Sequence, residues 1–461
     1  MLKSLLIARM NTALIKSLRN TSAFPHAVKN LKILETHISW VILTGEFAYK
    51  IKKPVDLGFV DFTSLERRKY FCEEELRLNQ RMTPDLYLDV VPIAETAAGP
   101  RIGQEPAVEY AVRMRQFPHE ARLDHQLELG RLYMEDMRAL AEMVAGFHES
   151  LPPKRVINSA EEVTRIRRFA LDNFTQIKTA FDGSTAPPDL SQIEAWTQQQ
   201  LETLTPLMEN RALDGFIREG HGDLHLANIA RPENRLILFD CLEFNPELRW
   251  IDPINDIAFL VMDLITNGRE DLAFTFLNAY LEQTGDYGGI AVLRFYLVYR
   301  CLVRAKVAAI QPGDSSDCGA SRSADNSRRY LQIAKILVNH STPPRLFITH
   351  GFSGVGKTWL GDRLIGKIPA IRIRSDVERK RLFNLAPGER SDSGVESGLY
   401  TASATDRTYQ HLAGLCDIGL RARFNMIADA TFLQRRHRVL FLDLADRLQV
   451  MPVILDCSAA V

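Results

Sequence analysis

Residues Gly351–Thr358 read G-F-S-G-V-G-K-T and match the pattern G-x-x-x-x-G-K-T. They follow the apolar run Leu346–Thr349 and precede the helix-compatible stretch Trp359–Ile365, which is the strand–loop–helix context that the pattern requires. Glycines allow the backbone to curl so that its N–H groups surround a phosphate at the start of a helix. The C-terminal part of the chain is therefore predicted to be an α/β domain with a parallel sheet and a phosphate-binding loop.

The side chains around this loop suit ATP and Mg²⁺. Lys357 is expected to reach the terminal phosphates, and Thr358 is expected to offer its hydroxyl to the metal. Asp429 ends an apolar strand-like run, as a metal-side carboxylate on a second strand does. Asp376 acts either as a base or substrate ligand, or as the N-cap of the helix that follows it. The residues expected to bind the nucleotide are Gly351, Ser353, Gly354, Val355, Gly356, Lys357 and Thr358.

A second group of polar residues lies earlier, in the segment His221–Asn228 (H-G-D-L-H-L-A-N), and is followed by the apolar run Ile237–Asp240. Phosphoryl transfer uses an Asp that orients the attacking hydroxyl, an Asn five residues later, and a second Asp after a short hairpin that holds magnesium with the Asn. Asp223, Asn228 and Asp240 fit these three places, and oxygen ligands of this kind suit Mg²⁺. The match of all three favours this interpretation over a turn that Asp223 merely caps.

Two further residues, His225 within this motif and Glu243 after it, each allow two interpretations. His225 either orients another group through a hydrogen bond or is a buried structural histidine. Glu243 either shapes the metal-binding loop or is a solvated carboxylate.

A kinase site also needs a lysine on a sheet and a glutamate on a helix that holds the lysine. Lys50 and Lys52 lie on one face of the strand-like segment 47–53, because side chains alternate along a strand. Lys50, which stands between apolar residues, is the first choice, and Lys52 is the reserve. Glu75 is the expected helix partner, although charges on a helix also occur on solvated faces.

The chain before the phosphate-binding loop predicts a small β-rich lobe followed by a larger helical lobe. Strands are expected at Trp40–Leu43, Phe47–Ile51, Tyr87–Ile93 and Glu109–Met114, with a tight turn at Thr44–Glu46 and a helix at Leu65–Met82. Further helices are expected at Met134–His148, Ile193–Leu204, Leu293–Ile310 and Tyr330–Val338. The polar segment Gln311–Arg328 is predicted to be a flexible loop.

The boundary between the two parts is placed at Ser341–Pro344, because Pro343 and Pro344 cannot continue a helix. The predicted organisation is an N-terminal extension at 1–23, a kinase-like domain at 24–340, a linker at 341–345 and a P-loop domain at 346–461. The fold class is thus an α+β two-lobe domain followed by an α/β domain.

From about Phe24 to Val338 the chain resembles the aminoglycoside phosphotransferase family, which has the protein-kinase-like two-lobe fold and phosphorylates hydroxyls of small molecules. The resemblance rests on the His221–Asn228 motif and on Asp240. It matches His221 to the histidine of the family's motif and implies that Asp223 is catalytic. With Lys50 and Glu75, which the strand and helix patterns suggest, these are the expected catalytic residues. Asn228 and Asp240 are implied to bind the metal.

The same resemblance implies two further features. Asp256–Ala258 matches a D-x-A motif on a helix, which suggests a structural carboxylate, and Met114–Pro118 falls where a hinge contacts adenine. One departure is that only Thr44–Glu46 stands where other kinases carry a G-x-G-x-x-G loop.

From about Arg345 onward the chain resembles small P-loop kinases, such as gluconate and nucleotide kinases. The order of the two parts resembles a family described as bifunctional aminoglycoside phosphotransferase/ATP-binding proteins. Those kinases carry lid arginines beyond the strand-like segment Met451–Cys457, whereas this sequence stops at Val461. The sheet is therefore expected to be incomplete, and either the sequence is truncated or the module binds nucleotide without efficient transfer.

Composition narrows the class of protein further. The 57 basic and 57 acidic residues give a formal net charge of zero, which does not favour a nucleic-acid or membrane partner bound through bulk charge. The six cysteines form no C-x-x-C pair, which is typical of a cytoplasmic protein. No run approaches the roughly 18 apolar residues of a membrane-spanning helix, Arg9 and Lys16 speak against a signal peptide, and Met10 is an alternative start.

The predicted function is therefore ATP-dependent phosphorylation of a hydroxyl on a small molecule, with the P-loop part as a second kinase or a regulatory ATPase. One alternative is a nucleotide-binding regulator with little or no transfer. A nucleic-acid kinase or helicase-like motor lacks support, because basic clusters and further motor motifs are missing from the sequence. The phosphate acceptor and the oligomeric state are not encoded in any recognisable motif.

Overall fold

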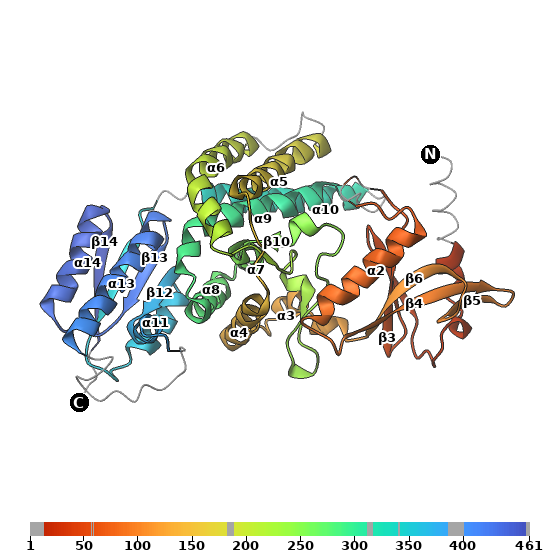
Figure 1. Cartoon of the computed structure of the whole chain (residues 1–461), viewed down its shortest axis with the longest axis horizontal. Helices are drawn as coiled ribbons and strands as arrows, with labels where there is room; N and C mark the ends of the chain where they lie inside the picture. Colours follow the sequence, from red (N-terminus) through yellow and green to blue (C-terminus); the bar gives the residue numbers. More distant parts are fainter. Residues whose placement is uncertain are drawn as a thin grey trace. The chain divides into compact units, whose positions relative to one another are not determined.

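The computed structural model describes residues 13–56, 58, 60–181, 189–310, 317–339, 342–385 and 401–457. The chain forms two compact units, each built from two stretches of sequence (Figure 1). The first unit comprises Met1–Leu132 and His221–Trp250, and the second comprises Tyr133–Gly220 and Ile251–Val461. The motif that begins at His221 therefore folds with the N-terminal sheet.

A six-stranded antiparallel sheet with the order β1-β2-β3-β6-β4-β5 forms the frame of the first unit. Its strands are β1 (Lys32–Glu35), β2 (Ser39–Leu43), β3 (Phe47–Lys52), β4 (Tyr87–Thr96), β5 (Gly99–Ile102) and β6 (Ala107–Arg115). The four predicted strands are confirmed as β2, β3, β4 and β6. Strands β1 and β5 were not predicted. Strand β5 contains Gly99, which weakens a strand, and Pro100, which is confined to edge strands or bulges.

The two faces of this sheet have different roles. Helix α2 (Leu65–Gln80) confirms the helix predicted at Leu65–Met82, and it begins at Ser64, whose Oγ accepts a hydrogen bond from the Arg67 N–H at 3.2 Å. Strand alternation directs Lys50 and Lys52 toward Glu75 of α2. The face toward α2 therefore carries the charged residues.

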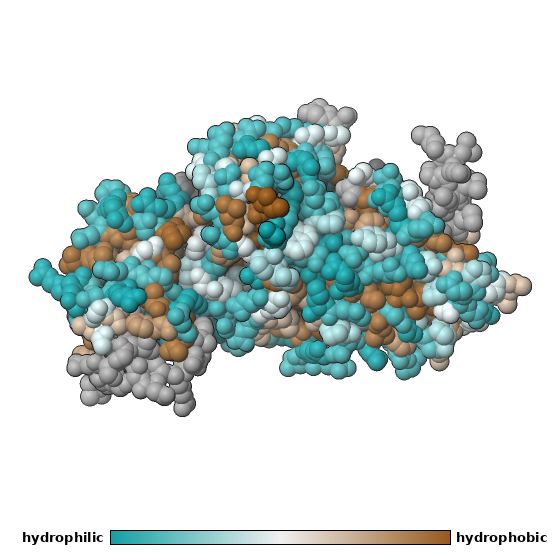
Figure 2. All heavy atoms as spheres, in the orientation of Figure 1, coloured by the Kyte–Doolittle hydropathy of each residue, from teal (hydrophilic) through white to brown (hydrophobic). Residues whose placement is uncertain are grey.

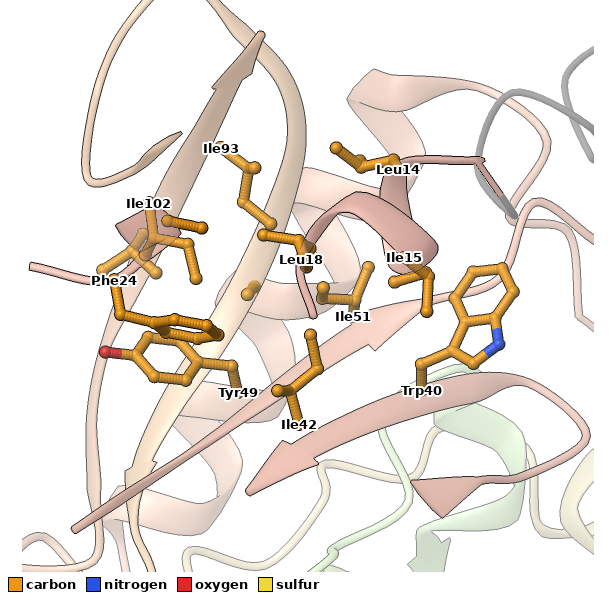
Figure 3. Close-up of a cluster of buried hydrophobic side chains, with 13 residues drawn as sticks. Leu14, Ile15, Leu18, Phe24, Trp40, Ile42, Tyr49, Ile51, Ile93 and Ile102 are labelled. Atoms are coloured by element: carbon orange, nitrogen blue, oxygen red, sulfur yellow. The ribbon is translucent and has the colours of Figure 1, made fainter. Parts of the chain in front are cut away.

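The opposite face carries an apolar cluster that includes Tyr49 and Ile51 of β3 (Figure 3). Leu14, Ile15 and Leu18, which the sequence analysis assigns to an N-terminal extension, are buried in this cluster. Residues 13–17 are helical, which brings these three side chains to one side of the segment. The N-terminal segment thus covers a sheet face that would otherwise expose aliphatic and aromatic side chains to water.

Helices make up the first part of the second unit. They are α4 (Met134–Ser150), α5 (Ser159–Ala180), α6 (Leu190–Leu213), α7 (Pro253–Thr266), α8 (Glu270–Thr284), α9 (Ile290–Ile310) and α10 (Asp317–Val338). The predicted helices at Met134–His148, Ile193–Leu204, Leu293–Ile310 and Tyr330–Val338 are confirmed within α4, α6, α9 and α10. Asp256 of α7 is buried, and its Oδ2 lies 3.2 Å from Nε2 of the buried His148.

The predicted flexible loop at Gln311–Arg328 is wrong over most of its length. Helix α10 already begins at Asp317, and residues 311–316 lie outside the described residues. The loop prediction relied on the polar composition of this segment, but the sequence contains no proline after Pro312 until Pro343. Leu331 and Ala334 are buried further along the same helix. Packing of this apolar end stabilises a helix that continues into the polar residues before it.

A four-stranded parallel sheet with the order β12-β13-β11-β14 forms the second part of this unit. Its strands are β11 (Arg345–His350), β12 (Ala370–Arg374), β13 (Asn425–Asp429) and β14 (Met451–Asp456), and its helices are α11 (Lys357–Ile365), α12 (Ser375–Leu382), α13 (Ala402–Arg421) and α14 (Arg435–Arg447). This arrangement confirms the predicted parallel α/β domain. The near-continuous apolar content of β11 and β13 is typical of strands covered on both faces.

Edge strand β12 is closed by a side chain of α8. Asn278 Nδ2 donates to the Ala370 carbonyl at 2.9 Å, and its Oδ1 accepts from the Arg372 N–H at 2.6 Å. Asn278 thus satisfies both backbone groups as a neighbouring strand would. The Arg374 guanidinium adds an ion pair to Glu282 of α8 at 2.8 Å. The P-loop sheet and α8 are therefore held together through specific polar contacts.

Hydrophilic residues cover much of the face shown in Figure 2, where hydrophobic residues lie in several separate areas. Among the described residues, no helix is both long and apolar enough to cross a bilayer.

Candidate active site

Glu75 lies between two lysines of strand β3. Its Oε1 is 2.8 Å from Lys50 Nζ, and its Oε2 is 2.8 Å from Lys52 Nζ. Lys50 Nζ also lies 2.5 Å from Oδ1 of Asp240. Both lysines considered from the sequence therefore reach Glu75, but only Lys50 is shown to contact the expected metal ligand.

The ionisation of these groups follows from their burial and pairing. Burial alone would raise the pKa of Glu75, but Lys50 and Lys52 outweigh that effect and lower the pKa to about 2. Burial would likewise lower the pKa of Lys50, but the carboxylates of Asp240, Glu75 and Glu243 hold it well above its ordinary value. Lys50 and Glu75 are therefore both charged at neutral pH, as an ion pair that binds nucleotide phosphates requires.

A short hairpin places the two predicted metal ligands side by side. Strands β8 (Ile229–Ala230) and β9 (Ile237–Leu238) pair antiparallel, so Asn228 directly precedes the hairpin and Asp240 follows it. The Phe239 N–H donates to the Asn228 carbonyl at 3.0 Å and extends this pairing. The sequence spacing between Asn228 and Asp240 is therefore set by the length of the β8–β9 hairpin that joins them.

Asn228 also contacts the predicted catalytic carboxylate. Its Nδ2 donates to the carbonyl of Asp223 at 3.0 Å and to Oδ2 of the same residue at 2.9 Å. Because the amide nitrogen is directed at Asp223, the amide oxygen is the atom that Asn228 would offer to the predicted metal. His225 is buried, and its Nε2 lies 3.3 Å from Asp223 Oδ2, which fits the orienting interpretation of this histidine.

His221 connects the two loops through their main chains. It is fully buried, its Nδ1 accepts from the Asp223 N–H at 3.3 Å, and its Nε2 lies 3.0 Å from the Phe239 carbonyl. These two contacts are compatible when the proton is on Nε2. His221 is therefore interpreted as a residue that positions Asp223 and the hairpin, rather than one that reacts itself.

Two backbone conformations support this geometry. Gly222 has φ +81°, and a Cβ there would lie 3.1 Å from the Leu248 carbonyl oxygen. Asp240 has φ +61°, a left-handed conformation that Asp tolerates better than most residues, and its N–H donates to the Tyr87 hydroxyl at 3.0 Å. The Asp240 side chain is 42% exposed, so its carboxylate is accessible to a metal ion.

These residues fit Mg²⁺ better than a metal held by protein groups alone. Within the part of the chain that the structure describes, no group of three or more His, Cys, Asp or Glu residues is arranged to hold a metal. Mg²⁺ is commonly bound by one or two protein oxygens together with the phosphates of a substrate. The Asp240 carboxylate and the Asn228 amide oxygen would be such a pair.

Glu243, which the sequence left as a loop-shaping or solvated residue, is buried. Its carboxylate contacts Lys52, and burial raises its pKa against the effect of that lysine. Its carbonyl accepts from Arg249 Nη1 at 2.9 Å. The solvated alternative is therefore wrong, because a carboxylate that loses its water needs a cation, and Lys52 supplies it.

The phosphate-binding loop has the conformation that its glycines require. Gly351, Gly354 and Gly356 have φ values of +142°, +86° and +89°. A Cβ on Gly351 would lie 2.5 Å from the Cys457 carbonyl oxygen. Lys357 Nζ, at the start of α11, donates to the carbonyls of Gly351 at 3.1 Å and Phe352 at 2.6 Å, so the lysine folds back over the loop. Ser353 and Val355 belong to the same turn, and Thr358 lies in the first turn of α11.

The other residues of this second site come from neighbouring strands. Asp429 ends β13 directly beside Arg374 of β12. Arg372 Nη1 donates to the Thr358 carbonyl at 3.1 Å and lies 4.0 Å from Asp429 Oδ2. Burial raises the pKa of Asp429, while Arg372 and Arg374 oppose that effect. A bound metal ion would also favour the ionised carboxylate.

Asp376 does not cap helix α12. The N-cap residue is Arg374, and Asp376 lies in the first turn, where its Oδ2 is 2.9 Å from Arg374 Nη2. The N-cap alternative is therefore wrong, because the helix begins at Ser375, two residues earlier than the sequence suggested. Arg372 and Arg374 were missed, although charged residues that alternate with isoleucine in a short buried strand are a visible signal.

The site and fold thus define a kinase-like domain followed by a P-loop domain. The model of a family described as "AAA domain" matches residues 346–460. Uncharacterized proteins of Mycobacterium tuberculosis and Mycobacterium bovis are 30% identical over 431 residues, which cover 94% of this chain and 84% of each relative. The chain belongs to the family of these proteins. The match over residues 346–460 confirms the predicted P-loop domain, which follows the kinase-like part as expected.

Solved structures with a similar fold have low identity. They include a choline/ethanolamine kinase family protein from Mesorhizobium loti, with a TM-score of 0.41, 12% identity, and coverage of 70% of this chain and 99% of that one. A choline kinase from Cryptosporidium parvum has a TM-score of 0.43 and 14% identity over 71% and 96% of the chains. An aminoglycoside 2'-phosphotransferase-IIIa in complex with GDP has a TM-score of 0.42 and 13% identity over 71% and 98%.

Asp240→Ala is expected to weaken binding of Mg-ATP to the first unit by roughly tenfold or more, because a carboxylate ligand of the metal is lost. Calorimetry of Mg-ATP binding in a Lys357→Ala background, where the P-loop is impaired, measures this effect. Asp85→Ala is a matched control, because Asp85 is 75% exposed and pairs with Arg235. Equal affinity in the Asp240 variant and the control would contradict the metal-binding role.

Proposed function

We propose that the first unit is an ATP-dependent phosphotransferase that acts on a hydroxyl of a small molecule. The observation that carries this proposal is the β8–β9 hairpin, which brings Asn228 and Asp240 together beside the Lys50–Glu75 pair and Asp223. These five groups supply every role that phosphoryl transfer needs from protein side chains.

Each residue has a defined part in this reaction. Lys50, held by Glu75, binds the phosphates of ATP, and Asp223 orients the acceptor hydroxyl and takes its proton as the oxygen bonds to the terminal phosphorus. The bond between that phosphorus and the bridging oxygen breaks, and ADP leaves. Mg²⁺, held by Asn228 and Asp240, would neutralise charge on the phosphates. Most of the catalytic effect is then positioning and electrostatic stabilisation.

The P-loop part is proposed to bind a second nucleotide. Lys357 would exchange its two carbonyl contacts for the terminal phosphates, while Thr358 and Asp429 would hold a metal. Asp376 is exposed at the carboxyl end of β12, where a base or substrate ligand is expected.

The alternative function is a nucleotide-binding regulator with little or no transfer. It is favoured by the turn between β2 and β3, which has a single glycine, Gly45, where kinases with a glycine-rich loop cover the phosphates. The ion pair between Lys50 and Asp240 does not distinguish the two functions. In either function, Lys50 must release Asp240 when a metal binds.

A cytoplasmic location and the absence of a nucleic-acid partner remain proposals. The balanced charge and the widely spaced cysteines support them. The described cysteines form no disulfide. The acceptor would be found by screening hydroxyl compounds with labelled ATP.

Asp223→Asn is expected to abolish phosphoryl transfer by the first unit, while ATP binding stays nearly intact. The amide keeps the shape of the carboxylate but cannot accept the hydroxyl proton. Acceptor-dependent ATP consumption and calorimetry measure the two properties, with Asp214→Asn at an exposed position as the control. Transfer within about tenfold of wild type, a loss of only 1.4 kcal/mol of transition-state stabilisation, would refute the assignment of Asp223.

Lys357→Ala is expected to remove one of two bound nucleotides and to leave transfer by the first unit largely intact. The P-loop phosphates lose a positive charge, whereas Asp223, Asn228 and Asp240 complete their own site. Nucleotide stoichiometry and acceptor-dependent ATP consumption are measured for this variant and for Lys367→Ala, an exposed control. One nucleotide bound to the wild type, or complete loss of transfer in the variant, would contradict independent sites.

A further inference from the structure

Strand β3 carries a second lysine that the proposed reaction does not use. Lys52 lies two residues after Lys50, and its side chain is completely buried. Its Nζ is 2.8 Å from Oε2 of Glu75 and also contacts Oε1 of Glu243. A buried lysine is costly unless it is paired, and this one is paired with two carboxylates.

The two lysines hold the segment that carries the metal ligand at two points. Lys50 contacts Asp240, and Lys52 contacts Glu243, three residues later. Glu75 is shared by both lysines. The same segment is tied to α2 through the Cys241 N–H, which donates to Asn79 Oδ1 at 3.0 Å. The segment is therefore fixed at Asp240, which has a left-handed backbone, and again at Cys241 and Glu243.

The side chains of this cluster favour the binding of a further cation. Lys50 and Lys52 face three carboxyl groups, those of Glu75, Asp240 and Glu243, so acidic side chains outnumber basic ones in the cluster. Asp240 is the most exposed of these side chains, at 42%. A metal ion that binds there competes with Lys50 for the same carboxylate, and Lys50 becomes available to the phosphates.

Lys52 differs from Lys50 in this respect. Both of its carboxylate partners are buried, with side-chain exposures of 0% for Glu75 and 4% for Glu243. Nothing that binds at Asp240 competes for them. When Lys50 turns toward a nucleotide, Lys52 can still hold Glu75 and the end of the metal-binding segment.

We propose that Lys52 and Glu243 are a positioning pair that keeps Asp240 and Glu75 in the geometry for metal and nucleotide binding, independently of Lys50. This inference rests on the proposed function of the first unit. Residues behind a metal ligand of this kind typically change metal affinity by about 10- to 100-fold when they are removed.

The test measures the Mg²⁺ requirement of nucleotide binding in the full-length chain with Lys357→Ala. A non-hydrolysable ATP analogue is titrated by calorimetry at a series of Mg²⁺ concentrations. Glu243→Gln, which keeps the shape of the side chain but removes its charge, is expected to raise the half-saturating Mg²⁺ concentration roughly tenfold. Lys52→Met is the second variant, and Glu243→Gln decides the result if Lys52→Met does not fold.

Lys53→Met is the matched control. Lys53 follows β3 directly but pairs with Glu35 at 2.6 Å and lies over the Trp40 ring, outside the cluster. Its Mg²⁺ requirement is expected to equal that of the parent. Thermal unfolding of every variant separates a general loss of stability from a specific loss of metal affinity.

The outcomes distinguish a failure of the positioning role from a failure of the proposed function. A lower unfolding temperature for Glu243→Gln with an unchanged Mg²⁺ requirement would overturn the positioning role and leave the proposed function standing. A parent that binds no Mg²⁺–analogue complex would overturn the proposed function, and this inference with it.

Discussion

The first unit depends on neutralising one completely buried carboxylate. Glu75 has no access to water, and an unpaired charge in that position would cost several kcal/mol. Lys50 and Lys52 neutralise it together, which fixes helix α2 against strand β3. Lys50 also contacts Asp240, so the same ion pair links the sheet to the segment that carries this proposed metal ligand. Fold and site therefore share one electrostatic constraint.

In the second unit, a buried carboxylate near the P-loop is likewise paired with cationic side chains. Arg372 and Arg374 bring positive charge to the buried Asp429, and contacts with α8 hold both arginines. Because Asn278 closes the edge of β12, the parallel sheet is integrated with the helices of this unit instead of being joined only by the linker at Pro343 and Pro344. Nucleotide binding at the P-loop is thus connected physically to α8.

Features with a local cause could be predicted from the sequence. Alternation along β3 correctly placed Lys50 and Lys52 on one face, and the spacing from Asn228 to Asp240 reflects a single hairpin. The glycines of the P-loop are likewise required by the conformation of that loop. These patterns lie within a few residues of one another, so a single sequence reveals them.

Features that depend on distant partners could not be predicted. Glu243 is buried because Lys52, almost two hundred residues earlier, pairs with it. Asn278 looks like an ordinary polar helix residue until strand β12 lies beside it. Leu14, Ile15 and Leu18 have a role only because the β-sheet leaves an apolar face uncovered. The polar start of α10 was mistaken for a loop because composition does not show that the helix packs at its other end.

The most direct test of this account is the affinity for Mg-ATP of the Glu75→Gln variant, measured by calorimetry in the full-length chain with Lys357→Ala. Glutamine keeps the volume of Glu75 but cannot neutralise two buried lysines. The account predicts that Mg-ATP affinity falls by at least about tenfold and that the unfolding temperature falls with it, because the charge positions both Lys50 and α2. Affinity within about twofold of the parent would contradict the account. The expected tenfold loss corresponds to only about 1.4 kcal/mol of binding free energy, which is a modest requirement.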